Sequence, residues 1–151
     1  MKAFALARVL QLAERQIEMQ ARAVKFAHGV WLRARGHQVR LMTVRDAHIA
    51  RLAVELRGGV AADSLREKNR LQLAQAAERH AARGEIDKAY HAWQARLAEW
   101  GEAEKRVKAL RLLEQRHLNH AAMQNKRLEQ RQHDELVELM HGRVAGTRQG
   151  R

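Results

Sequence analysis

Apolar residues recur at alternating steps of four and three in the segment from Ile86 to Leu118, which is the spacing of a coiled-coil seam. The positions of this stripe are Ile86, Tyr90, Trp93, Leu97, Trp100 and Val107. Glu104 is the one polar residue among them. Two tryptophans and a tyrosine on one helical face need a second apolar surface to cover them, so we expect this helix to pack lengthwise against another.

A comparable stripe near the N-terminus supplies the partner. It consists of Leu6, Leu10, Ala13, Ile17, Val24 and Trp31, and it continues less regularly through Leu41, Val44, Ile49, Leu52 and Leu56. We therefore predict an all-α fold in which two long helices form an antiparallel coiled-coil hairpin. A turn centred near Val60 sets Trp31 near Tyr90 and Leu10 near Arg111. The predicted coiled-coil core is Leu10, Ile17, Val24, Trp31, Ile86, Tyr90, Trp93, Leu97, Trp100 and Val107.

Turn and capping signals set the expected boundaries of a single hairpin over residues 1–141. The first helix is expected at about residues 3–57, because Gly58-Gly59 offers a left-handed C-terminal cap. A turn over 58–63 follows, and Ser64 with Glu67 forms a capping box that opens the second helix, at about 64–141. Gly142 is expected to end that helix, which leaves residues 142–151 as a flexible basic tail.

The second helix is the longer of the two, so its residues after about Leu118 are expected to project beyond the first helix. A thin apolar stripe continues there through Ala121, Leu128, Leu136 and Leu139. Nothing in the same chain remains to cover it. Such a stripe indicates a binding partner, disorder, or a homodimer that zips along residues 118–139.

Composition supports a helical rod and adds a charge. The 151 residues include no proline and only 4% aromatic residues, so nothing interrupts long helices and little supports a sheet. The net charge of +12 predicts an acidic partner, whether nucleic acid, an anionic membrane face or an acidic protein surface. Residues 1–57, 58–104 and 105–151 carry +7, −1 and +6 respectively. The absence of cysteine excludes disulfides, and no apolar run reaches the roughly 20 residues that span a bilayer, so we expect a cytoplasmic protein.

No set of residues in the chain is suited to catalysis, so we predict no enzyme, no cofactor and no small-molecule substrate. His117 and His120 have helical i, i+3 spacing, but neither cysteine nor a well-placed carboxylate completes a metal site, and we interpret them as surface residues. Asp134 and Glu135 are adjacent and point about 100° apart on a helix, so they cannot face each other as an acid and a base. A surface ion pair between Arg131 and Glu135 is expected instead.

Three stretches carry the pattern of a known family: FALARVLQLAERQIE at the start, WQARLAEWGEAEKRVKALRLLEQR in the second helix, and KRLEQRQHDEL near the end. With the two helices around a Gly-containing turn, they resemble the flagellar FliJ family from Phe4 to about His141. The family pattern of a basic pair, Glu-Gln and Asp-Glu falls on Lys126 and Arg127, Glu129 and Gln130, and Asp134 and Glu135. The partner-binding residues expected from it are Lys126, Arg127, Gln130, Arg131, Asp134 and Glu135.

The resemblance implies a non-enzymatic component of the flagellar type III export apparatus, similar to the central stalk of rotary ATPases. Members of the family insert an antiparallel coiled coil into the hexameric export ATPase and contact the membrane export gate. They also handle export chaperones. The implied location is the cytoplasmic side of the inner membrane, with peripheral attachment through the export apparatus.

Three other interpretations stay open from the sequence. The chain is also compatible with the equivalent stalk of a virulence injectisome, and with a purely structural homodimer. The third is a basic coiled coil that binds nucleic acid, since phosphate neutralisation needs only Lys and Arg on one face. Trp31, Trp93 and Trp100 sit at seam positions, which favours packing in the core over stacking on bases.

Overall fold

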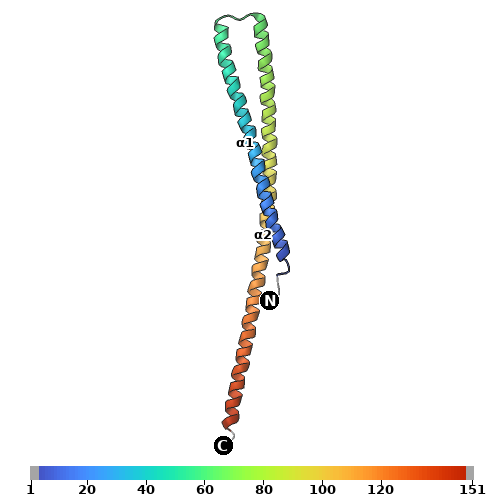
Figure 1. Cartoon of the computed structure of the whole chain (residues 1–151), viewed down its shortest axis with the longest axis vertical. Helices are drawn as coiled ribbons and strands as arrows, with labels where there is room; N and C mark the ends of the chain where they lie inside the picture. The colour runs from blue at the N-terminus through green and yellow to red at the C-terminus, as the bar shows by residue number, and fades with distance from the viewer. Residues whose placement is uncertain (1–3, 149–151) are drawn as a thin grey trace. The chain divides into compact units, whose positions relative to one another are not determined.

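The chain folds into two α-helices joined by a short turn (Figure 1). The structure, a computed structural model, describes the backbone of residues 4–148 and the side chains of residues 4–146. Helix α1 spans Ala7–Arg57 and helix α2 spans Ala62–Arg148, and no strand occurs between residues 4 and 148. The predicted all-helical hairpin with a longer second helix is confirmed.

Two compact units make up the chain, and both helices contribute to each of them. One unit is residues 15–104, which contain the turn, and the other is residues 1–14 together with residues 105–151. Within the first, α1 and α2 lie antiparallel on either side of the turn (Figure 1). Within the second, Arg111 of α2 pairs with Glu14 of α1 at 3.1 Å, one helical turn from the expected position of Arg111 beside Leu10.

The seam between the helices is thin and rich in alanine. The buried apolar residues are Ala82, Ala89 and Ala103 in the unit of residues 15–104, and Leu10, Ala13 and Val107 in the other. Of the predicted core residues, Leu10 and Val107 are buried, and seven are half-buried: Ile17, Val24, Trp31, Ile86, Trp93, Leu97 and Trp100. Small side chains at the seam let the two helix backbones approach closely, which leaves little space for large residues to be fully enclosed.

Two predicted seam positions are corrected by the structure. Tyr90 is 42% exposed, and the neighbouring Ala89 is buried in its place. Glu104 is half-exposed, and Ala103 takes the corresponding seam position. Steps of three and four link Trp100 to Val107 through either Ala103 or Glu104, and burying the methyl group avoids the cost of desolvating a carboxylate.

An aromatic cluster joins the two helices in the unit of residues 15–104. The rings of Trp31 and Trp93 stack with centroids 5.1 Å apart, and Tyr90 lies 6.2 Å from Trp31. His28 contacts Trp93 at 4.7 Å, and the Arg35 guanidinium lies 4.9 Å from the centre of the Trp31 ring. Such stacked and cation–π contacts add to the apolar burial, and they confirm the predicted juxtaposition of Trp31 with Tyr90 and Trp93.

Helix α1 ends at Arg57, as the Gly58-Gly59 pair predicts. Gly59 has a φ of +81°, in the left-handed region that favours glycine, and its N–H donates to the Leu56 carbonyl at 3.5 Å. The predicted capping box is wrong, because α2 begins at Ala62 and Ser64 lies inside its first turn. The Leu65 N–H donates to the Ala61 carbonyl at 3.1 Å, and the helix therefore begins two residues earlier than predicted. Asp63 places a carboxylate near the positive end of the helix dipole.

The two outer helix boundaries also differ from the prediction. Helix α1 begins at Ala7, after a turn in which the Ala7 N–H donates to the Phe4 carbonyl at 3.0 Å; Ala3 lies outside the described residues. Helix α2 continues through Gly142 to Arg148, so the predicted flexible tail is helical over residues 142–148, and residues 149–151 lie outside the description. One interior glycine costs a helix only about 1 kcal/mol and removes no hydrogen bond, so Gly142 does not end it.

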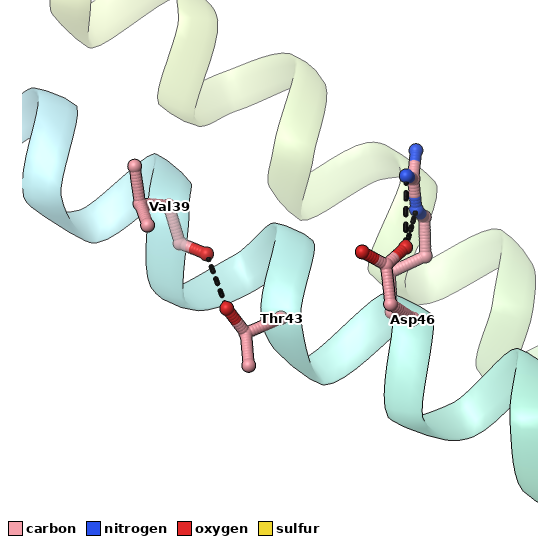
Figure 2. Close-up of polar contacts among 4 residues, drawn as sticks. Val39, Thr43 and Asp46 are labelled. Carbon is pink, nitrogen blue, oxygen red and sulfur yellow. Dashed lines mark hydrogen bonds and ion pairs between the residues drawn. The ribbon is translucent and has the colours of Figure 1, made fainter.

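Near the turn, polar residues join the seam. The half-buried positions that continue its spacing are Gln38, Leu41, Arg45, His48 and Leu52 on α1, and Lys68, Gln72, Gln75 and Arg79 on α2. Of the apolar residues expected to continue the stripe, Leu41 and Leu52 are half-buried, whereas Val44, Ile49 and Leu56 are 51%, 49% and 52% exposed. On the outer side of α1, the Thr43 hydroxyl donates to the Val39 carbonyl at 3.0 Å (Figure 2).

Two glycine substitutions are expected to change stability in opposite directions. Gly59→Ala should lower the free energy of unfolding by about 1 kcal/mol, because a Cβ disfavours the positive φ of this residue. Gly84→Ala should raise it by about 1 kcal/mol, because Gly84 is inside α2 and a Cβ there has no neighbour within 4 Å. Urea unfolding followed by circular dichroism measures both. Equal shifts of the same sign would show that the turn does not require glycine.

Candidate partner-binding segment

Among the described residues of its own unit, the last part of α2 is exposed. Two contacts in this unit involve the N-terminal part of the chain. Glu14 of α1 pairs with Arg111, and the ring of Phe4, just before α1, lies 5.7 Å from the ring of His117. Ala121 is half-buried, and every residue from 122 to 146 is exposed. We call residues 122–146 the C-terminal extension. It presents a regular helical surface on all sides to solvent or to a partner.

All six predicted partner-binding residues lie in the C-terminal extension and are exposed. Helical spacing arranges them in two adjacent columns of i, i+4 neighbours. One column is Lys126, Gln130 and Asp134, and the other is Arg127, Arg131 and Glu135. Each column therefore runs from a basic residue to an acidic one along the helix.

The expected surface pair between Arg131 and Glu135 is not formed. Among the described residues, neither side chain takes part in an ion pair or a hydrogen bond. Pairs of this kind on an exposed helix contribute only a few tenths of a kcal/mol, so solvation competes effectively with them. Both charges remain available to a partner.

The apolar surface of the C-terminal extension is wider than the sequence predicts. The predicted residues Leu128, Leu136 and Leu139 are 55%, 60% and 67% exposed. Met140 and Val144 extend this surface, at 69% and 61% exposed, and Val144 belongs to it because α2 does not end at His141. Leu136, Met140 and Val144 follow each other at i, i+4 spacing on one face. A helical segment with this much uncovered apolar area is typical of a docking surface.

The C-terminal extension is less basic than the +6 charge of residues 105–151 would indicate. Residues 122–146 contain four basic and four acidic side chains, so the C-terminal extension is neutral overall. Three of its basic residues, Lys126, Arg127 and Arg131, come first, and three of its four acidic residues lie between 134 and 138. The excess positive charge of residues 105–151 lies mainly before the extension, in residues 105–116. The extension therefore suits a partner with both charged and apolar surface.

Two further findings bear on function. Within residues 4–146, no three His, Cys, Asp or Glu side chains come together in an arrangement that holds a metal ion. No helix in the described part of the chain has the length and apolar character needed to cross a membrane.

Comparison with protein-family models gives one match, to the family described as the flagellar FliJ protein, over residues 1–146. The chain belongs to the FliJ family. The match covers nearly the whole chain, including the C-terminal extension, and it confirms the resemblance seen in the sequence. Membership of this family makes the chain a component of the flagellar protein export apparatus. No curated protein and no solved structure matches the chain.

Proposed function

We propose that this FliJ-family protein is a coiled-coil stalk that engages the hexameric export ATPase through its C-terminal extension and also contacts the membrane export gate. The exposure of every residue from 122 to 146, in a helix with uncovered leucines, carries the proposal. Buried apolar anchors ringed by charged residues are the usual composition of a tight interface. Leu128, with Arg131 three residues further along the same helical face, has this composition.

The stalk acts through unequal contacts with the ATPase subunits, and it catalyses no reaction itself. A single helix presents a different combination of side chains in each direction, so six identical ATPase subunits around it meet unequal surfaces. Those unequal contacts shift the subunit interfaces between conformations, which is how one asymmetric rod biases a symmetric ring. Complementary charges at Lys126, Arg127 and Arg131 speed the association and make it sensitive to salt.

Membership of the FliJ family supports the remaining proposed partners. The protein works at the cytoplasmic side of the inner membrane, attached peripherally through the gate protein, and it also binds export chaperones. The antiparallel coiled coil of residues 15–104 leaves long exposed helical faces for these contacts.

Mixing the protein with the flagellar export ATPase tests the proposal. We expect a stable complex, more ATPase hexamer by sedimentation, and faster ATP hydrolysis. An injectisome ATPase, tested in parallel, is expected to respond less. Absence of both complex and stimulation would contradict the proposal, and salt-sensitive DNA binding without any effect on hydrolysis would point to nucleic-acid binding instead.

A further inference from the structure

We propose that the polar part of the seam near the turn contains a binding site for a phosphate group. The site is a solvent-open recess between α1 and α2 with a volume of about 270 Å³, which we call the interhelical recess. A volume of this size is several times the roughly 30 Å³ that a water molecule occupies in the liquid, so a phosphate group fits. The six polar residues that line it are Arg45, His48, Asn69, Gln72, Gln75 and Arg79.

The lining is cationic and rich in hydrogen-bond donors. Two arginines on opposite helices share the recess, and no carboxylate lines it among the described residues. Arginine presents a planar fork of N–H groups that matches the oxygens of a phosphate, and the carboxamides of Asn69, Gln72 and Gln75 add further donors. The chemistry of the lining therefore selects an oxyanion over a cation or a neutral ligand.

The charges of the recess are only partly balanced within the protein. Two N–H groups of the Arg45 guanidinium donate to Asp46 Oδ1, at 3.1 and 2.9 Å (Figure 2). The Asp46 side chain is 65% exposed and does not line the recess. Arg79 has no ion-pair partner among the described residues. Lys68, also a half-buried seam cation, is instead paired with Glu55 of α1. Arg79 is thus a seam position where the protein places a cation without supplying its counter-charge.

An unsatisfied nitrogen provides a second, independent observation. The Nε2 atom of His48 is enclosed and has no hydrogen-bond partner in the described part of the chain. Enclosed polar atoms nearly always have a partner, so such an atom in the wall of a polar recess indicates a missing ligand. A phosphate oxygen supplies that partner once the imidazole turns toward the recess, because an imidazole N–H donates to such an oxygen. A bound phosphate would thus satisfy His48 and neutralise Arg79 together.

Titration with inorganic phosphate tests the site on the whole chain, with sodium chloride adjusted to keep ionic strength constant. We expect a saturable rise in the melting temperature and a shift of the His48 imidazole resonances in the NMR spectrum. Arg79→Gln should weaken phosphate affinity about 10- to 100-fold, as loss of a charged hydrogen-bond donor does. Without phosphate, the same variant should melt higher than the unmodified chain, because it removes one of two like charges from the recess.

The control is Arg83→Gln, which makes the same change of charge one turn further along α2, at an exposed position outside the lining. It should keep the phosphate response. Equal responses of the two variants would overturn the proposal, since phosphate would then act only on the overall charge. A parallel titration with metal-free ATP identifies the source of the group: saturation by phosphate indicates the free ion, saturation by ATP alone indicates a nucleotide, and saturation by neither overturns the site.

The proposal involves no residue of the C-terminal extension, and its test needs no export ATPase. Failure of phosphate binding would therefore leave the stalk function standing, and failure of ATPase engagement would leave the phosphate site standing.

Discussion

Replacing Trp93 with alanine is expected to lower the free energy of unfolding by about 3 kcal/mol. The indole of Trp93 stacks on Trp31 with centroids 5.1 Å apart and also contacts His28 and Tyr90, so its loss removes the centre of the aromatic cluster. The expected cost lies at the lower end of the range for Trp→Ala because the ring is half-buried. In a protein held by a thin seam, this is a large part of the total stability. Urea unfolding followed by circular dichroism measures the effect.

Two comparison variants separate packing from a general effect of removing an aromatic ring. Phe26→Ala removes a ring that is 71% exposed, and it should change stability by less than about 0.5 kcal/mol. Trp93→Phe keeps a ring in the cluster and should recover most of the loss. If Phe26→Ala proved as costly as Trp93→Ala, the cluster at Trp31 and Trp93 would not be the packing centre of its unit.

The hairpin itself could be predicted because it rests on long-range repetition. Spacing of three and four over many turns identifies a helix and its buried face, and the Gly58-Gly59 pair identifies the reversal. The pairing of Trp31 with Trp93 then follows from counting away from the turn. Each of these inferences averages over many residues, so no single misassigned position changes the result.

The choice between adjacent seam positions could not be made in the same way. Tyr90 and Ala89 both lie at acceptable steps between Ile86 and Trp93, and the larger apolar residue was the natural choice. Hydrophobicity alone does not report how closely two backbones approach. The structure buries Ala89 at 7% exposed and leaves Tyr90 at the edge, because a close approach has space for a methyl group and not for a phenol ring.

The interhelical recess was missed for a related reason. Searching for apolar residues beyond Trp31 selected Leu41 and Leu52, which are half-buried, but also Val44 and Ile49, which are exposed. Extending the three-and-four spacing regardless of residue type would have selected Arg45 and His48, which are half-buried. The signal was therefore present in the register of the helix. A seam can change from apolar to polar while its geometry continues, and that change marks a place where the chain departs from simple core packing.

Replacing Leu128 with aspartate is expected to weaken binding to the export ATPase about 10- to 100-fold, which is the usual loss at an interface anchor. Leu128 is 55% exposed in the C-terminal extension, and covering this position with the apolar surface of a partner would bury the introduced carboxylate without a counter-charge. The same exposure means that the isolated protein loses no packing, and its helical content should stay unchanged. Arg127→Glu should have a comparable effect through reversal of charge. Sedimentation and ATP hydrolysis in the mixture measure both variants against circular dichroism of the free chain.

Matched changes elsewhere decide whether the C-terminal extension is the binding surface. Leu12→Asp introduces the same group at a leucine of α1 that is 62% exposed, and Arg83→Glu reverses a charge at an exposed position of α2. Both should bind and stimulate the ATPase as the unmodified chain does. If the Leu128 variant loses helicity, the C-terminal extension contributes to folding of the free protein and is not only a docking surface. If Leu12→Asp weakens binding as much as Leu128→Asp, the ATPase contacts α1 as well, and the asymmetry that lets one rod bias a ring must come from both helices together.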